Sequence, residues 1–140
     1  MHSIIISISV ALLLSLSSIG QEVYHYNAIA QDADTEADLM QLLDANPDDE
    51  KANYNLAILH YNHAIKMIEE MDYDGTFEER SKIQDQVTDV FNKALPYAEK
   101  AHEINPDKPE TIKMLSGIHF GLNGMDKSKY YESLYTEKTK

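Results

Sequence analysis

The chain has 140 residues, enough for one domain, and carries 24 acidic against 12 basic side chains, a formal net charge of −12. This charge argues against nucleic acid as a partner, because phosphates need a footprint of Lys and Arg, and equally against anionic lipid surfaces. The sequence contains no Cys. Disulfides, on which small exported domains often rely, therefore cannot stabilise this chain. Its stability must come from the packing of its secondary structure, which the pattern below predicts to be helical.

Residues 1–20 have the layout of a secretory signal peptide. An apolar run within Ser3–Ile19 leads to small residues, ends at Gly20 and is followed by polar Gln21-Glu22. We expect cleavage after Gly20 and an exported protein, periplasmic or extracellular, with no membrane span after cleavage. The alternative is an uncleaved anchor, because no Lys or Arg precedes the run and its length is at the short limit for a spanning helix. No Cys follows the run, which excludes a lipoprotein anchor.

Residues 21–34 fit either a short helix or a loose arm. From residue 35 to residue 140 the pattern is helical throughout. Thr35 with Asp38 resembles a helix start, and the helix that follows ends at Asn46-Pro47. Its apolar face consists of Leu39, Met40, Leu42 and Leu43.

The next predicted helix, over residues 49–71, has apolar residues on two faces. One stripe is Ala52, Leu56, Leu59, His63 and Met67, and the opposite stripe is Tyr54, Ile58, Tyr61, Ile65 and Ile68. A helix with two apolar faces has neighbours on two sides or lines a groove.

Three further helices complete the prediction. Thr76-Phe77-Glu78-Glu79 reads as a capping box that begins a helix running to about Glu103. Pro109 suits the first turn of the next helix, which closes at Asn123-Gly124. A last helix carries Tyr130, Tyr131, Leu134 and Tyr135.

The segment from Lys93 to Pro106 resembles the second helix of a tetratricopeptide (TPR) repeat. Ala94 and Ala101 stand where that family keeps small residues, and Pro106 stands where a repeat ends. The segments Ala52–Ala57 and Thr111–Leu122 look like first helices of such repeats. The resemblance implies an all-α fold: a short TPR-like array of helical hairpins, a right-handed α-solenoid of about five helices.

The spacing departs from that family in one respect. Asn46 and Asn105 are 59 residues apart, whereas the TPR period is about 34 residues. The excess lies between Asn62 and Ala94 and lengthens both helices of one hairpin. In this the chain is similar to exported repeat proteins of Bacteroidetes-type bacteria. Asn53 also replaces a large aromatic residue of the family pattern.

The resemblance also implies where a partner would bind. In TPR repeats the positions of Tyr54, Ile58, Tyr61 and Ile65 face the concave side, and we name these four, with Lys113, as partner-binding candidates. The partner would be another envelope protein or peptide, or a second copy of the chain. The alternative is that the helix containing Leu39–Leu43 covers this stripe. The Lys/Asn set with which some TPR proteins clamp a terminal carboxylate is absent, because Ile58 takes one of its places.

Other candidate sites have weaker support. Glu70-x-Asp72-x-Asp74-Gly75 resembles a calcium loop, but Ser81 occupies the position that needs a bidentate Glu. His60 and His63 are spaced to share a metal, yet packed histidines fit better, since no Cys or carboxylate accompanies them at ligand spacing. No nucleophile–base motif or phosphate loop is present. We therefore expect no catalysis, no metal site and no cofactor.

The sequence thus favours a non-catalytic protein–protein interaction or scaffold module of the cell envelope. The alternative function is a carrier that binds a small ligand or a metal through the histidines and the long hairpin.

Overall fold

The computed structural model describes residues 34–140, and all regular secondary structure in this range is helical. The helices are α2 (Asp34–Ala45), α3 (Glu50–Glu69), α4 (Phe77–Ile104), α5 (Pro109–Gly121) and α6 (Met125–Lys138). For residues 34–140 the prediction of an all-helical fold with about five helices is confirmed. The predicted signal peptide and the arm up to residue 33 lie outside the described residues.

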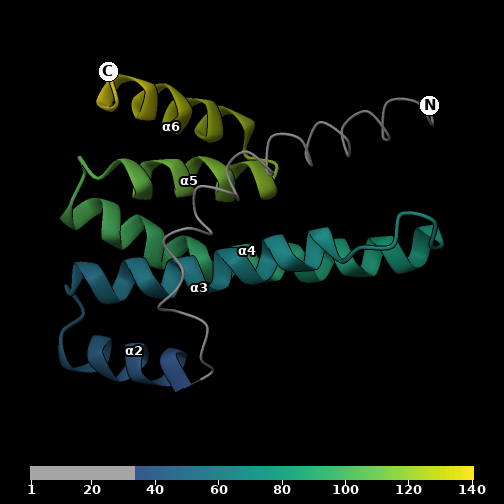
Figure 1. The fold of residues 1–140 in the computed structure, drawn as a ribbon, viewed down its shortest axis with the longest axis horizontal. Helices are drawn as coiled ribbons and strands as arrows, with labels where there is room; N and C mark the ends of the chain where they lie inside the picture. Colours follow the sequence, from purple (N-terminus) through teal and green to yellow (C-terminus); the bar gives the residue numbers. More distant parts are fainter. Residues whose placement is uncertain (1–33) are drawn as a thin grey trace.

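The helices follow one another in space in the order in which they occur in the chain. α3 and α4 form a long hairpin, α5 and α6 form a shorter one, and α2 packs on α3 (Figure 1). α4 contacts α5, and α3 also reaches α5. Within residues 34–140, no helix combines the length and the apolar character needed to cross a membrane.

Local sequence signals account for most of the helix ends. Asp49 caps α3 by accepting a hydrogen bond from the Ala52 amide at 2.8 Å. The capping box predicted at Thr76 and Glu79 begins α4, and Pro109 occupies the first turn of α5. The predicted start of α2 at Thr35 is wrong, because the helix already includes Asp34.

The turn between α5 and α6 satisfies the carbonyls at the end of α5. The Gly124 amide donates to the His119 carbonyl at 2.7 Å, and the Asn123 amide donates to the Phe120 carbonyl at 3.0 Å. This is a Schellman ending, which needs a residue in the left-handed region. Asn123 fills that role with a φ of 58°, so the Asn of the predicted Asn-Gly ending, rather than the Gly, takes the special conformation.

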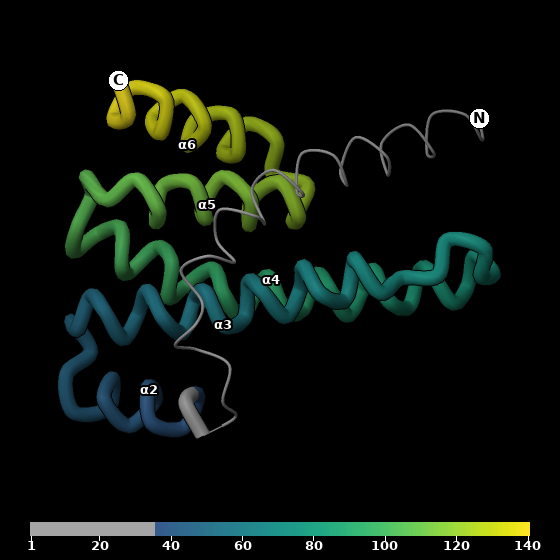
Figure 2. Tube along the Cα trace, viewed as in Figure 1, coloured from purple at the N-terminus to yellow at the C-terminus, as the bar shows by residue number. Residues whose placement is uncertain are grey.

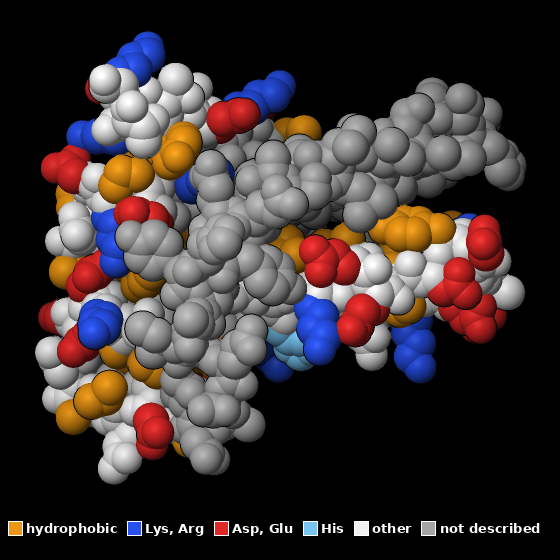
Figure 3. Space-filling model, viewed as in Figure 1, with side chains coloured by type: hydrophobic (Ala, Val, Ile, Leu, Met, Phe, Trp, Pro, Cys, Tyr) orange, Lys and Arg blue, Asp and Glu red, His pale blue; other side chains and the backbone are white. Residues whose placement is uncertain are grey.

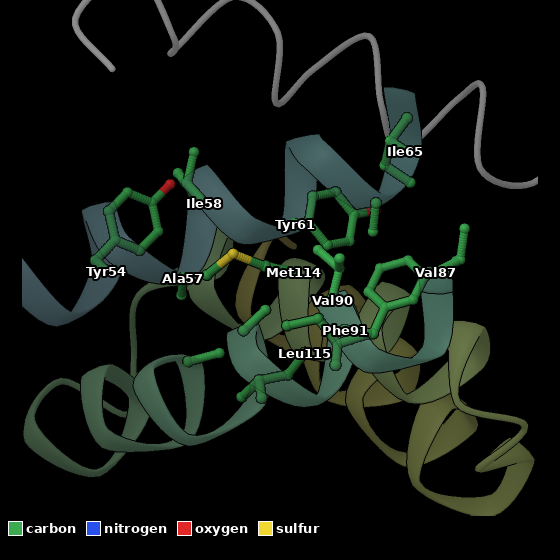
Figure 4. Packing of buried hydrophobic residues seen from close by; sticks show 14 of the residues in the cluster. Tyr54, Ala57, Ile58, Tyr61, Ile65, Val87, Val90, Phe91, Met114 and Leu115 are labelled. Atoms are coloured by element: carbon green, nitrogen blue, oxygen red, sulfur yellow. The ribbon is translucent and has the colours of Figure 1, made fainter. Parts of the chain in front are cut away.

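The main core lies where α3, α4 and α5 meet (Figure 4). Phe91, Ala94, Ala98 and Leu115 have no exposed surface there. Alanines at three successive turns of α4 keep the backbones of neighbouring helices close, which suits a tightly packed stack. A second, smaller cluster joins α2 to the other side of α3 through Leu39, Ala52 and Leu56.

The α3–α4 hairpin extends beyond the other helices as an arm (Figure 2). α4 has 28 residues and α5 has 13. At about 1.5 Å per residue these helices are roughly 42 and 20 Å long. The difference carries the turn between α3 and α4 away from the shorter helices.

Candidate interaction surfaces

The stripe that the sequence marks on α3 is buried. Tyr54 is 7% exposed, Ile58 and Ile65 are each 3% exposed, and Tyr61 is not exposed at all. All four belong to the main core cluster, together with residues of α4 and α5. They come from one helix and lie along it in the predicted register (Figure 4).

The proposed cover of this stripe lies elsewhere. Leu39 of α2 packs with Ala52 and Leu56, and Leu43 also contacts that cluster. α2 therefore meets the other apolar stripe of α3, and the alternative in which residues 39–43 cover Tyr54 and Tyr61 is wrong. Ala52 and Leu56 on one face of α3 and the Tyr54 stripe on the other thus have separate neighbours, as the sequence pattern indicates, whereas Met67 packs on the main core.

Tyr61 is the most enclosed member of the stripe. Its ring lies 5.8 Å from the ring of Phe91, and Gly117 of α5 faces its hydroxyl so closely that a Cβ there would lie 2.6 Å from the oxygen. Among residues 34–140 the hydroxyl has no hydrogen-bond partner. Burial raises the pKa of Tyr61 well above its usual value. A buried Tyr hydroxyl usually finds a partner, so this residue is placed at an energetic cost.

Two lysines near the start of α5 contact tyrosine rings, and Lys108 lies over a ring of the stripe. Lys113 lies 5.1 Å from the centre of the Tyr135 ring, which α6 supplies. The ammonium group of Lys108 lies over the ring of Tyr54, 3.7 Å from the ring centre, and the same ammonium group lies 2.8 Å from the carboxylate of Glu50. Lys108 thus ties the start of α5 to the start of α3. The sequence gives no local signal for this contact, since the partners are more than fifty residues apart.

The predicted histidine pair is split between two environments. His60 is buried, its Nε2 lies 3.6 Å from Glu36, and its ring stacks on Tyr97 with the ring centres 6.2 Å apart. Burial lowers the pKa of His60, and the nearby Glu36 opposes that shift. His63 is exposed. In the part of the chain that the structure describes, no three His, Asp or Glu residues are grouped so that they could hold a metal ion.

A second group of aromatic side chains joins α4, α5 and α6. His119 stacks parallel to Tyr131, and His102 meets the edge of the same ring, each at 5.6 Å between ring centres. The Nε2 of His119 and the Nδ1 of His102 are buried and have no hydrogen-bond partner in the described part of the chain. Burial lowers the pKa of both histidines.

A shallow groove of about 270 Å³ opens between α2 and α4. Met40, Leu43, Pro47 and Tyr97 are among its lining residues. Asn53 also lines it. Its amide donates to the carbonyls of Pro47 and Asp49 at 3.0 and 2.9 Å, so it holds the Asn-Pro turn between α2 and α3.

The turn between α3 and α4, residues 70–76, is held by its own side chains. The Arg80 guanidinium donates to the carbonyls of Tyr73 and Gly75, both at 2.7 Å. Asp72 accepts from the Asp74 amide at 2.9 Å. The Glu79 carboxylate accepts from the Thr76 amide and hydroxyl, which lowers the pKa of Glu79. The acidic turn that resembled a calcium loop is thus a closed helix–helix turn.

This turn presents two large aromatic side chains. Phe77 is 77% exposed, more than any other large hydrophobic residue in the described chain, and Tyr73 is 43% exposed. Residues 69–79 include six acidic side chains and no Lys or Arg. Acidic side chains gather at this end of the hairpin (Figure 3). We call residues 69–79 the hairpin tip.

The sequence reasoning missed Phe77 as a surface residue, although a signal was present. Phe77 precedes Ile83 of the buried face of α4 by six residues. At about 100° per residue this places it about 120° around the helix from Ile83 and roughly 90° from the mean direction of the buried residues of α4. Its neighbours one turn on, Arg80 and Ser81, are polar.

No protein-family model, no curated protein and no solved structure matches this chain.

Proposed function

We propose that the protein is a non-catalytic interaction module of the cell envelope with TPR-like architecture. In this proposal α3–α4 and α5–α6 are consecutive repeats of a short α-solenoid, and α2 is the last helix of an incomplete first repeat. The contacts of α3 with α5, and the alanines of α4 at the contact with its neighbours, support that arrangement. The apolar run within residues 1–20 supports export to the periplasm or the cell exterior.

The observation that carries the proposal is the projecting hairpin with an exposed aromatic residue at its tip. A soluble protein gains nothing in stability from a phenylalanine that is 77% exposed. Aromatic side chains that become buried on association supply much of the binding energy of protein interfaces. An arm that lifts such a residue away from the body of the molecule suits contact with another protein.

Site-specific photo-crosslinking tests the proposal. A photoreactive amino acid is placed at Phe77 or, as a control, at the exposed Glu137 near the end of α6, and the native envelope fraction is illuminated. The proposal predicts a discrete protein adduct from position 77 that is absent from position 137. No adduct from position 77, or the same adducts from both positions, would overturn it.

A further inference from the structure

We propose that the hairpin tip binds an arginine-bearing basic segment of the partner protein. This inference rests on the proposed interaction function and adds the chemical class of the segment that is bound. Three features of the tip carry it: the exposed rings, the charge around them and the fixed shape of the turn.

The first feature is the pair of rings. Phe77 and Tyr73 are four residues apart in one turn, and both expose a large part of their surface. The face of an aromatic ring attracts a cation, and the planar guanidinium group of Arg can also stack on it. The Tyr73 hydroxyl lies 3.5 Å from the Ile68 carbonyl, which holds that side chain against the hairpin.

The second feature is charge complementarity. The tip contributes six of the chain's 24 acidic side chains within eleven residues, and none of its 12 basic ones. Asp74 and Glu78 flank Phe77 along the chain and are exposed. Arg80 follows the tip, but its guanidinium group is committed to the carbonyls of Tyr73 and Gly75. A basic segment would find carboxylates beside the rings, and guanidinium–carboxylate pairs are stronger than neutral hydrogen bonds.

The third feature is the fixed shape of the turn. The capping box, the Asp72 contact and the two Arg80 bonds hold the backbone from Tyr73 to Glu79 before any partner arrives. A surface that is already ordered loses little conformational entropy on binding, so more of the contact energy appears as affinity. The exposed rings therefore stand on a rigid base.

A matched aromatic residue elsewhere provides the control. Tyr130 on α6 is 61% exposed, which is close to the exposure of Phe77. Lys127 and Lys129 precede it along that helix together with Asp126, so its surroundings are not purely acidic as those of the hairpin tip are. If exposure alone made a binding surface, Tyr130 would serve as well as Phe77. If the surrounding negative charge is also required, only the hairpin tip should bind a basic peptide.

Fluorescence anisotropy of the purified protein with three labelled synthetic peptides tests the proposal. One peptide repeats Arg-Leu-Gly, the second has Lys and the third Glu in place of each Arg. We expect the arginine peptide to bind most tightly, the lysine peptide more weakly and the glutamate peptide not at all. Binding should weaken as ionic strength rises, because the tip charges are exposed.

Variants locate the site. Phe77→Ser, and separately Asp74→Asn with Glu78→Gln, should weaken arginine-peptide binding by about tenfold or more. Tyr130→Ser should leave binding within about twofold, the effect typical of a residue outside an interface. These side chains are exposed, so the melting temperatures should match the parent. Equal binding of the arginine and glutamate peptides, or undiminished binding by Phe77→Ser, would overturn the proposal. A crosslinked partner at position 77 without arginine-peptide binding would refute this inference and leave the interaction function standing.

Discussion

Replacing Tyr61 by phenylalanine should stabilise the protein. The hydroxyl of Tyr61 is fully buried and has no hydrogen-bond partner among the residues that the structure describes. Leaving a buried polar group unpaired costs about 1–3 kcal/mol, and Tyr61→Phe removes the group while keeping the ring that packs on Phe91. We expect the free energy of unfolding to rise by about 1 kcal/mol. Tyr130→Phe, at an exposed ring, is the matched control and should change stability by less than about 0.5 kcal/mol.

The same hydroxyl should determine the effect of a substitution on α5. A Cβ at Gly117 would lie 2.6 Å from the Tyr61 oxygen but 3.1 and 3.2 Å from the nearest ring carbons. In the parent protein, Gly117→Ala should suffer an overpacking cost of about 1–3 kcal/mol, which a gain in helix propensity of about 1 kcal/mol partly offsets. In the Tyr61→Phe background the closest contact is removed, and the alanine should be nearly neutral.

A double-mutant cycle measures this coupling. Urea unfolding of the four proteins, followed by circular dichroism, should give an interaction energy of about 1–2 kcal/mol. Effects that add within about 0.5 kcal/mol would mean that Gly117 does not face Tyr61, and the contact between α3 and α5 would be wrong. A loss of stability in Tyr61→Phe would mean that the hydroxyl has a partner.

Three other predictions concern packing, pH and processing. Ala94→Leu or Ala101→Leu should destabilise the protein by about 1–3 kcal/mol through overpacking, because neither residue has any exposed surface. Ala45→Leu, at an exposed position, should leave stability unchanged. Equal melting temperatures of all three variants would contradict the packing of α4. Burial lowers the pKa of His119 below its unfolded value of 6.5, so the unfolded chain binds more protons and stability should fall as the pH drops through and below 6.5. His119→Phe should flatten this loss in pH-dependent melting while His63→Gln should not, and an unchanged profile for His119→Phe would assign the loss to other groups. Intact-mass measurement of the envelope fraction should show a chain shorter by residues 1–20, and full-length protein in the cytosol would contradict export.

Most of the helix ends could be predicted because they depend on adjacent residues. The capping box at Thr76 and Glu79 and the proline that opens α5 act within one helical turn. The helical period of the apolar residues likewise marked α3 to α5 without any knowledge of their partners. The two apolar stripes of α3 correctly indicated neighbours on two sides.

The sequence could not tell which neighbour packs on which side of α3. Leu39–Leu43 offered an apolar face that fitted either stripe, and only the path of the chain after Asn46-Pro47 places it on Ala52 and Leu56. The same limit explains why the sequence could not show which lysine lies over the ring of Tyr54. Lys108 is the N-cap of α5 and Lys113 lies in its second turn, and the packing of α5 on α3 decides that Lys108 lies over the ring.

The tip was missed for a different reason. The carboxylates and the glycine of the turn are ordinary in a solvated turn, and Phe77 stands inside the capping box, where its type is not restricted. Its position away from the buried face of α4 was present in the sequence. An aromatic residue off the apolar stripe and beside a cluster of like charges is a signal that can be searched for without a structure.

Quantitative co-purification from the native envelope tests most directly whether the hairpin tip is where the protein meets its partner. Tagged parent, Phe77→Ser and Tyr130→Ser proteins are compared, with equal melting temperatures as the condition for including each variant. We predict that a protein recovered with the parent is retained by Tyr130→Ser and lost with Phe77→Ser. Full retention of that protein by Phe77→Ser would contradict the account.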